Sequence, residues 1–102
     1  MITKELRRNE RFPATEPVEV CWEESDGPKF ARATCLNISP EGISMRMDQA
    51  LPVRSHVTFR SAKLKLSGTA SVRYCIRRNS WYQVGLEFNP GVRFNKESLT
   101  FA

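Results

Sequence analysis

The sequence predicts an all-β fold of one domain, a small barrel or sandwich of about six strands. Three observations support this prediction. Apolar and polar residues alternate with a period of two in short runs. Turn-forming residues separate these runs at the spacing typical of small barrels and sandwiches. The 102 residues are the length of a single domain, and no repeat, linker or central amphipathic helix interrupts the pattern.

The first two predicted strands are residues 17–22 and 29–38. The first of them, PVEVCW, alternates two valines and a tryptophan with Glu and Cys. The second, KFARATCLNI, alternates more loosely. Residues 25–28, SDGP, lie between the two and contain only turn-forming residue types. The pattern therefore predicts a turn between the two strands.

The third predicted strand, residues 42–47, shows the clearest alternation. Ile43, Met45 and Met47 lie on one side of GISMRM, and Ser44 and Arg46 lie on the other. The preceding residues SPEG form a predicted turn. This segment is therefore expected to be half-buried.

The second half of the chain completes the set with residues 53–60, 62–77 and 81–88. The long run 62–77 contains Gly68, which predicts a bulge or bend there, and the last run contains Gly85. The sequence RNS at 78–80 predicts a hairpin turn. These segments bring the expected number of strands to six.

The two ends of the chain carry weaker signals. Residues 1–13 have too few apolar side chains for a buried helical stripe, so a flexible, basic and mostly extended arm is expected. Residues 94–102 are long enough for at most a short C-terminal helix.

Composition restricts the class of protein. The net charge of +5 favours anionic partners such as a nucleotide, a nucleic acid or an anionic surface. The three cysteines lie among apolar or β-forming residues, which predicts small buried side chains in a reducing compartment rather than a disulfide framework. The sequence contains no apolar run long enough for a membrane span and no signal peptide, so a cytoplasmic location is expected.

The residues argue against an enzyme. The single histidine, His56, is expected on a strand surface, with no second histidine or cysteine at metal-ligand spacing. Glu23 and Glu24 are adjacent, so on a strand they face opposite sides and do not form an acid–base pair. No phosphate-binding glycine loop or nucleophile elbow is present. We expect no catalytic residue, no metal and no cofactor.

Two polar groups of residues suggest a ligand instead. Arg7, Arg8 and Arg11 place three guanidinium groups close together near the N-terminus. Arginine binds phosphate bidentately, stacks on flat bases and donates in pairs to guanine. Asn37 and Ser39 are two residues apart at a strand end and face the same side. Together these groups predict a guanine-bearing phosphate compound held between arm and barrel.

The same residues resemble the signature of PilZ domains, a family of bacterial receptors for cyclic di-GMP. The resemblance consists of Arg7-x-x-x-Arg11 followed by Asn37-x-Ser39-x-x-Gly42, and it continues through GTASVRY and WYQVGLEFN near the end. It implies a six-stranded antiparallel β-barrel over residues 14–102, preceded by an arm over residues 1–13.

The resemblance also implies roles for single residues. The arginines Arg7, Arg8 and Arg11 would bind the phosphates and guanines of cyclic di-GMP, and Asn37 would read a guanine edge. Ser39 and Gly42 match the second motif directly. Tyr74 corresponds to a position at which relatives carry an aromatic residue that stacks on the ligand.

Two features differ from the family pattern. Leu6 precedes the first arginine, which leaves open whether one or two ligand molecules bind. The C-terminal tail is shorter than the helix of many relatives. The implied function is a non-enzymatic receptor that changes conformation and signals to an unidentified downstream protein in motility, exopolysaccharide export or related surface behaviour.

Two alternatives remain at this point. A basic β-barrel could bind RNA or single-stranded DNA through four aromatic side chains, Trp22, Phe30, Trp81 and Tyr82. A PilZ-like domain could also serve only as a protein-interaction module, independent of any ligand.

Overall fold

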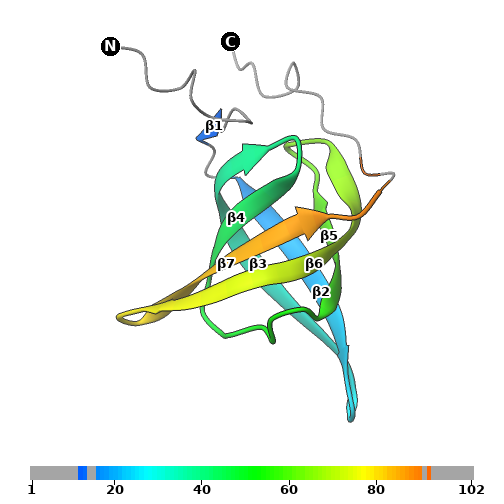
Figure 1. Cartoon of the computed structure of the whole chain (residues 1–102), viewed down its shortest axis with the longest axis vertical. Helices are drawn as coiled ribbons and strands as arrows, with labels where there is room; N and C mark the ends of the chain where they lie inside the picture. The colour runs from blue at the N-terminus through cyan, green and yellow to red at the C-terminus, as the bar shows by residue number, and fades with distance from the viewer. Residues whose placement is uncertain (1–11, 14–15, 91, 93–102) are drawn as a thin grey trace.

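The fold is an antiparallel β-barrel in a computed structural model that describes residues 12–13, 16–90 and 92. Its strands are β1 (Phe12–Pro13), β2 (Pro17–Glu24), β3 (Gly27–Ser39), β4 (Gly42–Met47), β5 (His56–Ser61), β6 (Leu66–Arg78) and β7 (Trp81–Phe88). The strand order is β1-β3-β2-β5-β6-β7-β4, and an additional β3–β4 pairing closes the barrel (Figure 1). The predicted barrel of six strands, β2 to β7, is confirmed, and β1 is a short addition to it.

Both predicted end segments lie largely outside the described residues. The predicted arm falls outside the described residues except at Phe12 and Pro13, which form β1. The predicted C-terminal helix at 94–102 falls outside them entirely. No helix long and apolar enough to cross a membrane occurs among the described residues.

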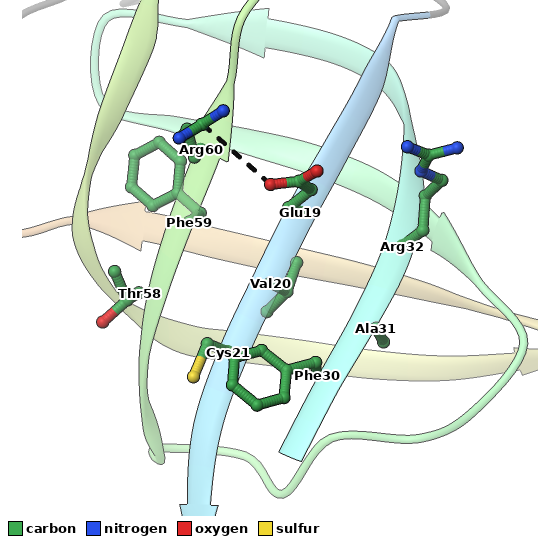
Figure 2. A pocket seen from close by; sticks show the side chains of 9 residues that line it. All are labelled: Glu19, Val20, Cys21, Phe30, Ala31, Arg32, Thr58, Phe59 and Arg60. Atoms are coloured by element: carbon green, nitrogen blue, oxygen red, sulfur yellow. Dashed lines mark ion pairs between the residues drawn. The ribbon is translucent and has the colours of Figure 1, made fainter. Parts of the chain in front are cut away.

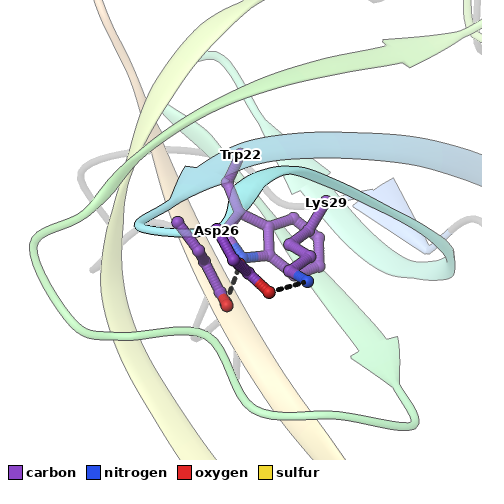
Figure 3. A network of polar contacts seen from close by, with 4 residues as sticks. Trp22, Asp26 and Lys29 are labelled. Atoms are coloured by element: carbon purple, nitrogen blue, oxygen red, sulfur yellow. Dashed lines mark hydrogen bonds and ion pairs between the residues drawn. The ribbon is translucent and has the colours of Figure 1, made fainter.

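The hairpin of β2 and β3 extends below the barrel in Figure 1. Its register pairs Glu24 with Gly27, so Ser25 and Asp26 form the loop. The Lys29 ammonium lies 3.0 Å from the Asp26 carboxylate, and the buried Trp22 indole donates to Glu24 at 2.8 Å (Figure 3). These contacts fix the tip of the hairpin, at the turn predicted from SDGP.

Two predicted strands begin too early. The first begins at His56 rather than residue 53, because Pro52 to Ser55 form a turn in which the Ser55 amide and hydroxyl both donate to the Pro52 carbonyl. The second begins at Leu66 rather than residue 62, after a turn closed by Lys65. Arg54 and Lys65 have φ values of 75° and 54°, which interrupt an extended strand.

The core fills the barrel with inward-facing residues from all six barrel strands and two loops. Its largest fully buried side chains include Phe59, Ile38, Met45 and Met47. The Phe59 ring stacks on Phe88 with ring centroids 5.2 Å apart. The apolar side of residues 42–47 predicted from the alternation is this core face, which is confirmed.

Two β-bulges change which side chains face outward. In β3, Leu36 is an extra residue between Cys35 and Asn37, since these two pair with the adjacent residues Met45 and Ser44 of β4. Cys35 and Ile38 are both buried, three positions apart rather than two. Strict alternation would have turned Asn37 into the core with Cys35. The bulge places Asn37 on the outer surface instead.

The second bulge lies in β6 and acts in the same way. Arg73 is the extra residue, because Val72 and Tyr74 pair with the adjacent residues Leu86 and Gly85 of β7. Val72 is buried in the core, and Tyr74 faces outward. Of the bulge or bend predicted at Gly68, the unbroken β5–β6 register excludes the bulge, and Gly68 has a φ of 154°.

The three cysteines differ in their surroundings. None forms a disulfide, and only Cys35 is fully buried, whereas Cys21 and Cys75 are half-buried. The prediction of three buried cysteines is therefore correct for Cys35 alone. Burial, with a smaller contribution from the Glu16 carboxylate, raises the pKa of the Cys35 thiol from 9.0 to about 12.

This shift predicts a loss of stability in alkaline solution. The unfolded chain ionises Cys35 near pH 9 while the folded chain keeps it protonated, so the free energy of unfolding falls as the pH rises from 9 towards 12. Urea unfolding of the wild type and of Cys35→Ala at several pH values measures it. The wild type is expected to lose more stability than the variant over this range, and equal losses would contradict the assignment.

Candidate ligand site on the outer face of the barrel

The second predicted motif lies at the hairpin between β3 and β4. Ser39 pairs with Gly42, so that Pro40 and Glu41 form a two-residue loop. Ser39 is buried, and its hydroxyl accepts a hydrogen bond from the Glu41 amide at 3.3 Å and donates to the Gly42 carbonyl at 3.5 Å. In this structure the hydroxyl of Ser39 therefore shapes the turn.

Strands β4 and β7 approach so closely at Gly42 that only glycine fits there. A Cβ atom at this position would overlap the backbone carbonyl of Leu86 in β7. Gly42 is not among the residues with positive φ, so the described geometry requires the absence of a side chain here rather than a left-handed backbone. The glycine lets β4 and β7 pack tightly behind the loop.

Asn37 lies in a row of paired residues that crosses four strands. It pairs with Ser44 of β4, Ser44 pairs with Gly85 of β7, and Gly85 pairs with Tyr74 of β6. Directly paired residues face the same side of a sheet. The two bulges therefore bring Asn37 and Tyr74 to the two ends of one row on the outer face.

Tyr74 lies flat across this row. A Cβ atom at Gly85 would overlap the ring carbons of Tyr74, so the ring covers the glycine directly. The Tyr74 hydroxyl donates to the Ser44 hydroxyl at 3.2 Å. Since Gly85 occupies one side of the ring, Tyr74 presents a fixed aromatic surface next to Ser44 and Asn37, suited to stacking on a flat base.

Further polar contacts hold Ser44 in place. The Gln83 amide donates to the Ser44 hydroxyl at 3.1 Å, and its oxygen accepts two hydrogen bonds from the Arg78 guanidinium at 2.7 and 3.1 Å. Ser44 is buried although it faces away from the core, because Tyr74 and Gln83 contact it. Ser44 and Gln83 were not predicted as site residues, but the alternation in GISMRM had already placed Ser44 on the polar side.

A cation–π pair lies farther along the same face. The Arg46 guanidinium lies 4.7 Å from the centre of the Trp81 ring. Arg46 pairs with Gln83 in the β4–β7 register, so this pair adjoins the contacts around Ser44. Trp81 is thereby half covered, and it is not a free stacking platform.

The N-terminal segment meets this face through β1. Phe12 pairs with Ile38, and Pro13 pairs with Asn37. The predicted ligand-binding arginines Arg7, Arg8 and Arg11 lie outside the described residues. What the structure gives is the course of the chain directly after Arg11, which runs beside the strand that carries Asn37 and Ser39.

Metal binding has no support among the described residues. It contains no group of three or more His, Cys, Asp or Glu side chains arranged to hold an ion. His56 is exposed and lies 3.4 Å from the Ser71 hydroxyl, as expected of a surface strand residue.

Comparison with known proteins supports the PilZ resemblance. The family model described as PilZ domain matches residues 5–99, nearly the whole chain. The chain belongs to the PilZ family. No curated protein sequence matches it.

Solved structures of PilZ proteins share the fold. Escherichia coli YcgR in complex with c-di-GMP matches with a TM-score of 0.62 at 15% identity. The match covers 82% of this chain and 38% of the YcgR chain. Bacillus subtilis MotI/DgrA, an inhibitor of motility, has a TM-score of 0.67 at 16% identity, with 91% and 46% covered.

A third structure is the K. pneumonia MrkH–c-di-GMP complex, with a TM-score of 0.64, 16% identity, and 81% and 44% covered. This PilZ chain therefore spans less than half the length of these three relatives.

Because Tyr74 packs on Gly85, substitutions at these two positions should have coupled effects on the free energy of unfolding. Gly85→Ala is expected to lower the free energy of unfolding by about 1–3 kcal/mol, because the new methyl group overlaps the ring. In a Tyr74→Ala background the same substitution should cost much less. A double-mutant cycle by urea unfolding measures the coupling.

Gly42→Ala is the matched control for this cycle. Its Cβ meets the Leu86 backbone, so Tyr74→Ala should not relieve its cost. Equal costs of Gly85→Ala with and without the Tyr74 ring would contradict the described packing.

Proposed function

We propose that this PilZ domain is a receptor for cyclic di-GMP that binds the ligand on the outer face of β3, β4, β7 and β6. The observation that supports it most directly is the row of paired residues from Asn37 to Tyr74, with β1 beside Asn37. The complexes of YcgR and MrkH with c-di-GMP add support from relatives of the same fold.

Each residue of the site has a proposed role. Arg7, Arg8 and Arg11 bind the phosphates and guanine edges through paired N–H groups. Asn37 offers both a donor and an acceptor to a guanine edge. Tyr74 stacks on a base. Ser39 and Gly42, named as ligand-binding from the motif, act mainly through the shape of the turn that carries Asn37.

The covalent connection keeps the arginines within reach of the row. Arg11 directly precedes Phe12, so their Cα atoms are about 3.8 Å apart, and Arg7 adds at most roughly 14 Å. The row crosses three strand intervals, about 14 Å in all. A segment tethered at Phe12 is therefore long enough to pass over the bound ligand. We propose that residues 1–13 act as this arm and residues 14–102 as the barrel.

The free energy of these contacts is sufficient for micromolar binding of the ligand. A hydrogen bond to a charged group contributes about 1.5–3 kcal/mol, and a dissociation constant of 1 μM corresponds to about 8 kcal/mol. Two or three arginine contacts, base stacking and the Asn37 edge supply this after the cost of ordering the arm.

The proposed action is binding without catalysis. Cyclic di-GMP draws the arm over the barrel, and a partner protein recognises the changed face. The ligand's surroundings connect onward through Ser44, Gln83 and Arg78 to the β6–β7 hairpin. We propose a cytoplasmic adaptor whose unidentified partner acts in motility, exopolysaccharide export or related surface behaviour.

Calorimetric titration with cyclic di-GMP tests the receptor. The wild type is expected to bind at micromolar concentration or tighter, and Arg11→Ala and Asn37→Ala should each weaken binding at least about tenfold. Arg77→Ala is the matched control, because it removes the same charge at the β6–β7 hairpin. This variant should bind cyclic di-GMP like the wild type. Equal weakening by Arg11→Ala and Arg77→Ala would indicate a response to net charge only.

Single-stranded RNA provides a comparison in the same assay. Of the four aromatic side chains that an RNA-binding barrel would use, only Phe30 is exposed. Trp22 is buried, Trp81 is partly covered by Arg46, and Tyr82 packs against the core. RNA binding that matched cyclic di-GMP and fell steeply with salt would overturn the receptor.

Ligand binding should also protect the arm. Amide hydrogen exchange of residues 4–12 is expected to slow by at least about tenfold with saturating cyclic di-GMP, because the arm then packs on the ligand. Amides of the core strand β5 serve as the internal control and should not change. Unaltered exchange in the arm despite measured binding would reject the closing movement.

A further inference from the structure

A second concave surface lies on the outer face of β3, β2 and β5, away from the proposed ligand site. It has a volume of about 550 Å³, within the range of small-molecule sites. Two rows of paired residues form it: Phe30, Cys21 and Thr58, and beside them Arg32, Glu19 and Arg60 (Figure 2). No residue of this groove belongs to the row between Asn37 and Tyr74.

The first row provides an apolar surface. Phe30 is 75% exposed although it lies in a paired strand, and it is the most exposed large apolar residue among the described ones. Its ring lies beside Cys21 in Figure 2. Strand pairing fixes the backbone of both residues, so an occupant would find their Cα positions already in place.

The second row provides positive charge. Arg32 and Arg60 lie on either side of Glu19, and the Arg60 guanidinium is 3.9 Å from its carboxylate. Arg32 forms no ion pair with any carboxylate of the described residues. The groove therefore carries one guanidinium beyond the charge that Glu19 balances.

The spacing of these groups defines an occupant. Phe30 and Arg32 are two residues apart on one strand, so they face the same side about 6.6 Å apart. We propose that the groove binds a small amphipathic anion, whose aromatic or aliphatic body packs on Phe30 and Cys21 and whose carboxylate, sulfonate or phosphate pairs with Arg32. Arg60 contributes when it turns from Glu19.

The test uses 8-anilinonaphthalene-1-sulfonate with the 102-residue chain. Its addition should shift the amide resonances of residues 19–21, 30–32 and 58–60 in a saturable manner and leave those of Asn37 and Tyr74 unmoved. Phe30→Ser and Arg32→Gln should each weaken binding about fivefold or more. The matched controls Val53→Ser and Lys63→Gln, both at exposed positions outside the groove, should bind like the wild type.

Several outcomes would overturn the proposal. Shifts spread over the whole barrel, wild-type affinity in both groove variants, or equal binding of a neutral naphthalene ketone would each do so. Concentration-dependent dimerisation that Phe30→Ser abolishes would assign the groove to a second copy of the chain instead. Near-UV circular dichroism checks that every variant is folded.

The result is independent of the receptor proposal. Phe30→Ser should bind cyclic di-GMP as the wild type does, because no residue is shared between the two sites. Failure of the chain to bind cyclic di-GMP would leave the groove assay unaffected, and an unoccupied groove would leave the titration of cyclic di-GMP unaffected.

Discussion

Two β-bulges create the outer face on which the proposed site depends. A strand alternates its side chains strictly, and with Cys35 and Val72 inside the barrel, alternation would direct both Asn37 and Tyr74 into the core. One extra residue in each strand, Leu36 and Arg73, reverses this. The Asn37 amide stays out of the core, because a polar group inside the core would need a buried partner. The Tyr74 ring becomes available on the surface.

Two glycines then allow close packing at this face of the barrel. Gly85 accommodates the Tyr74 ring, and Gly42 accommodates the carbonyl of Leu86. The ring is held by its contact with β7 on one side and by the hydrogen bond to Ser44 at its end. An aromatic side chain fixed in this way loses little conformational entropy when a base stacks on it, which favours ligand binding.

The barrel carries two separate outer faces with different chemistry. The face of β3, β4, β7 and β6 holds the amide, the hydroxyl and the fixed tyrosine, and β1 enters beside it. The face of β3, β2 and β5 holds an apolar row that contains the exposed Phe30, with an arginine row beside it. Strand β3 is long enough to contribute its C-terminal half to the first face and its N-terminal half to the second. A domain of this size thus has room for the proposed ligand and for a second contact.

The sequence by itself determined the architecture and the family. Period-two alternation and turn residues are local signals, so GISMRM and the loop at Asn79 and Ser80 indicated β4 and the last hairpin correctly. The signature Arg7-x-x-x-Arg11 and Asn37-x-Ser39-x-x-Gly42 indicated PilZ membership, which the family model confirms. Only the tertiary structure decided which neighbours those residues meet. The bulges, the reason for Gly42 and the exposure of Phe30 all depend on strand pairs far apart in the sequence, and alternation within one strand carries no information about its partner's register.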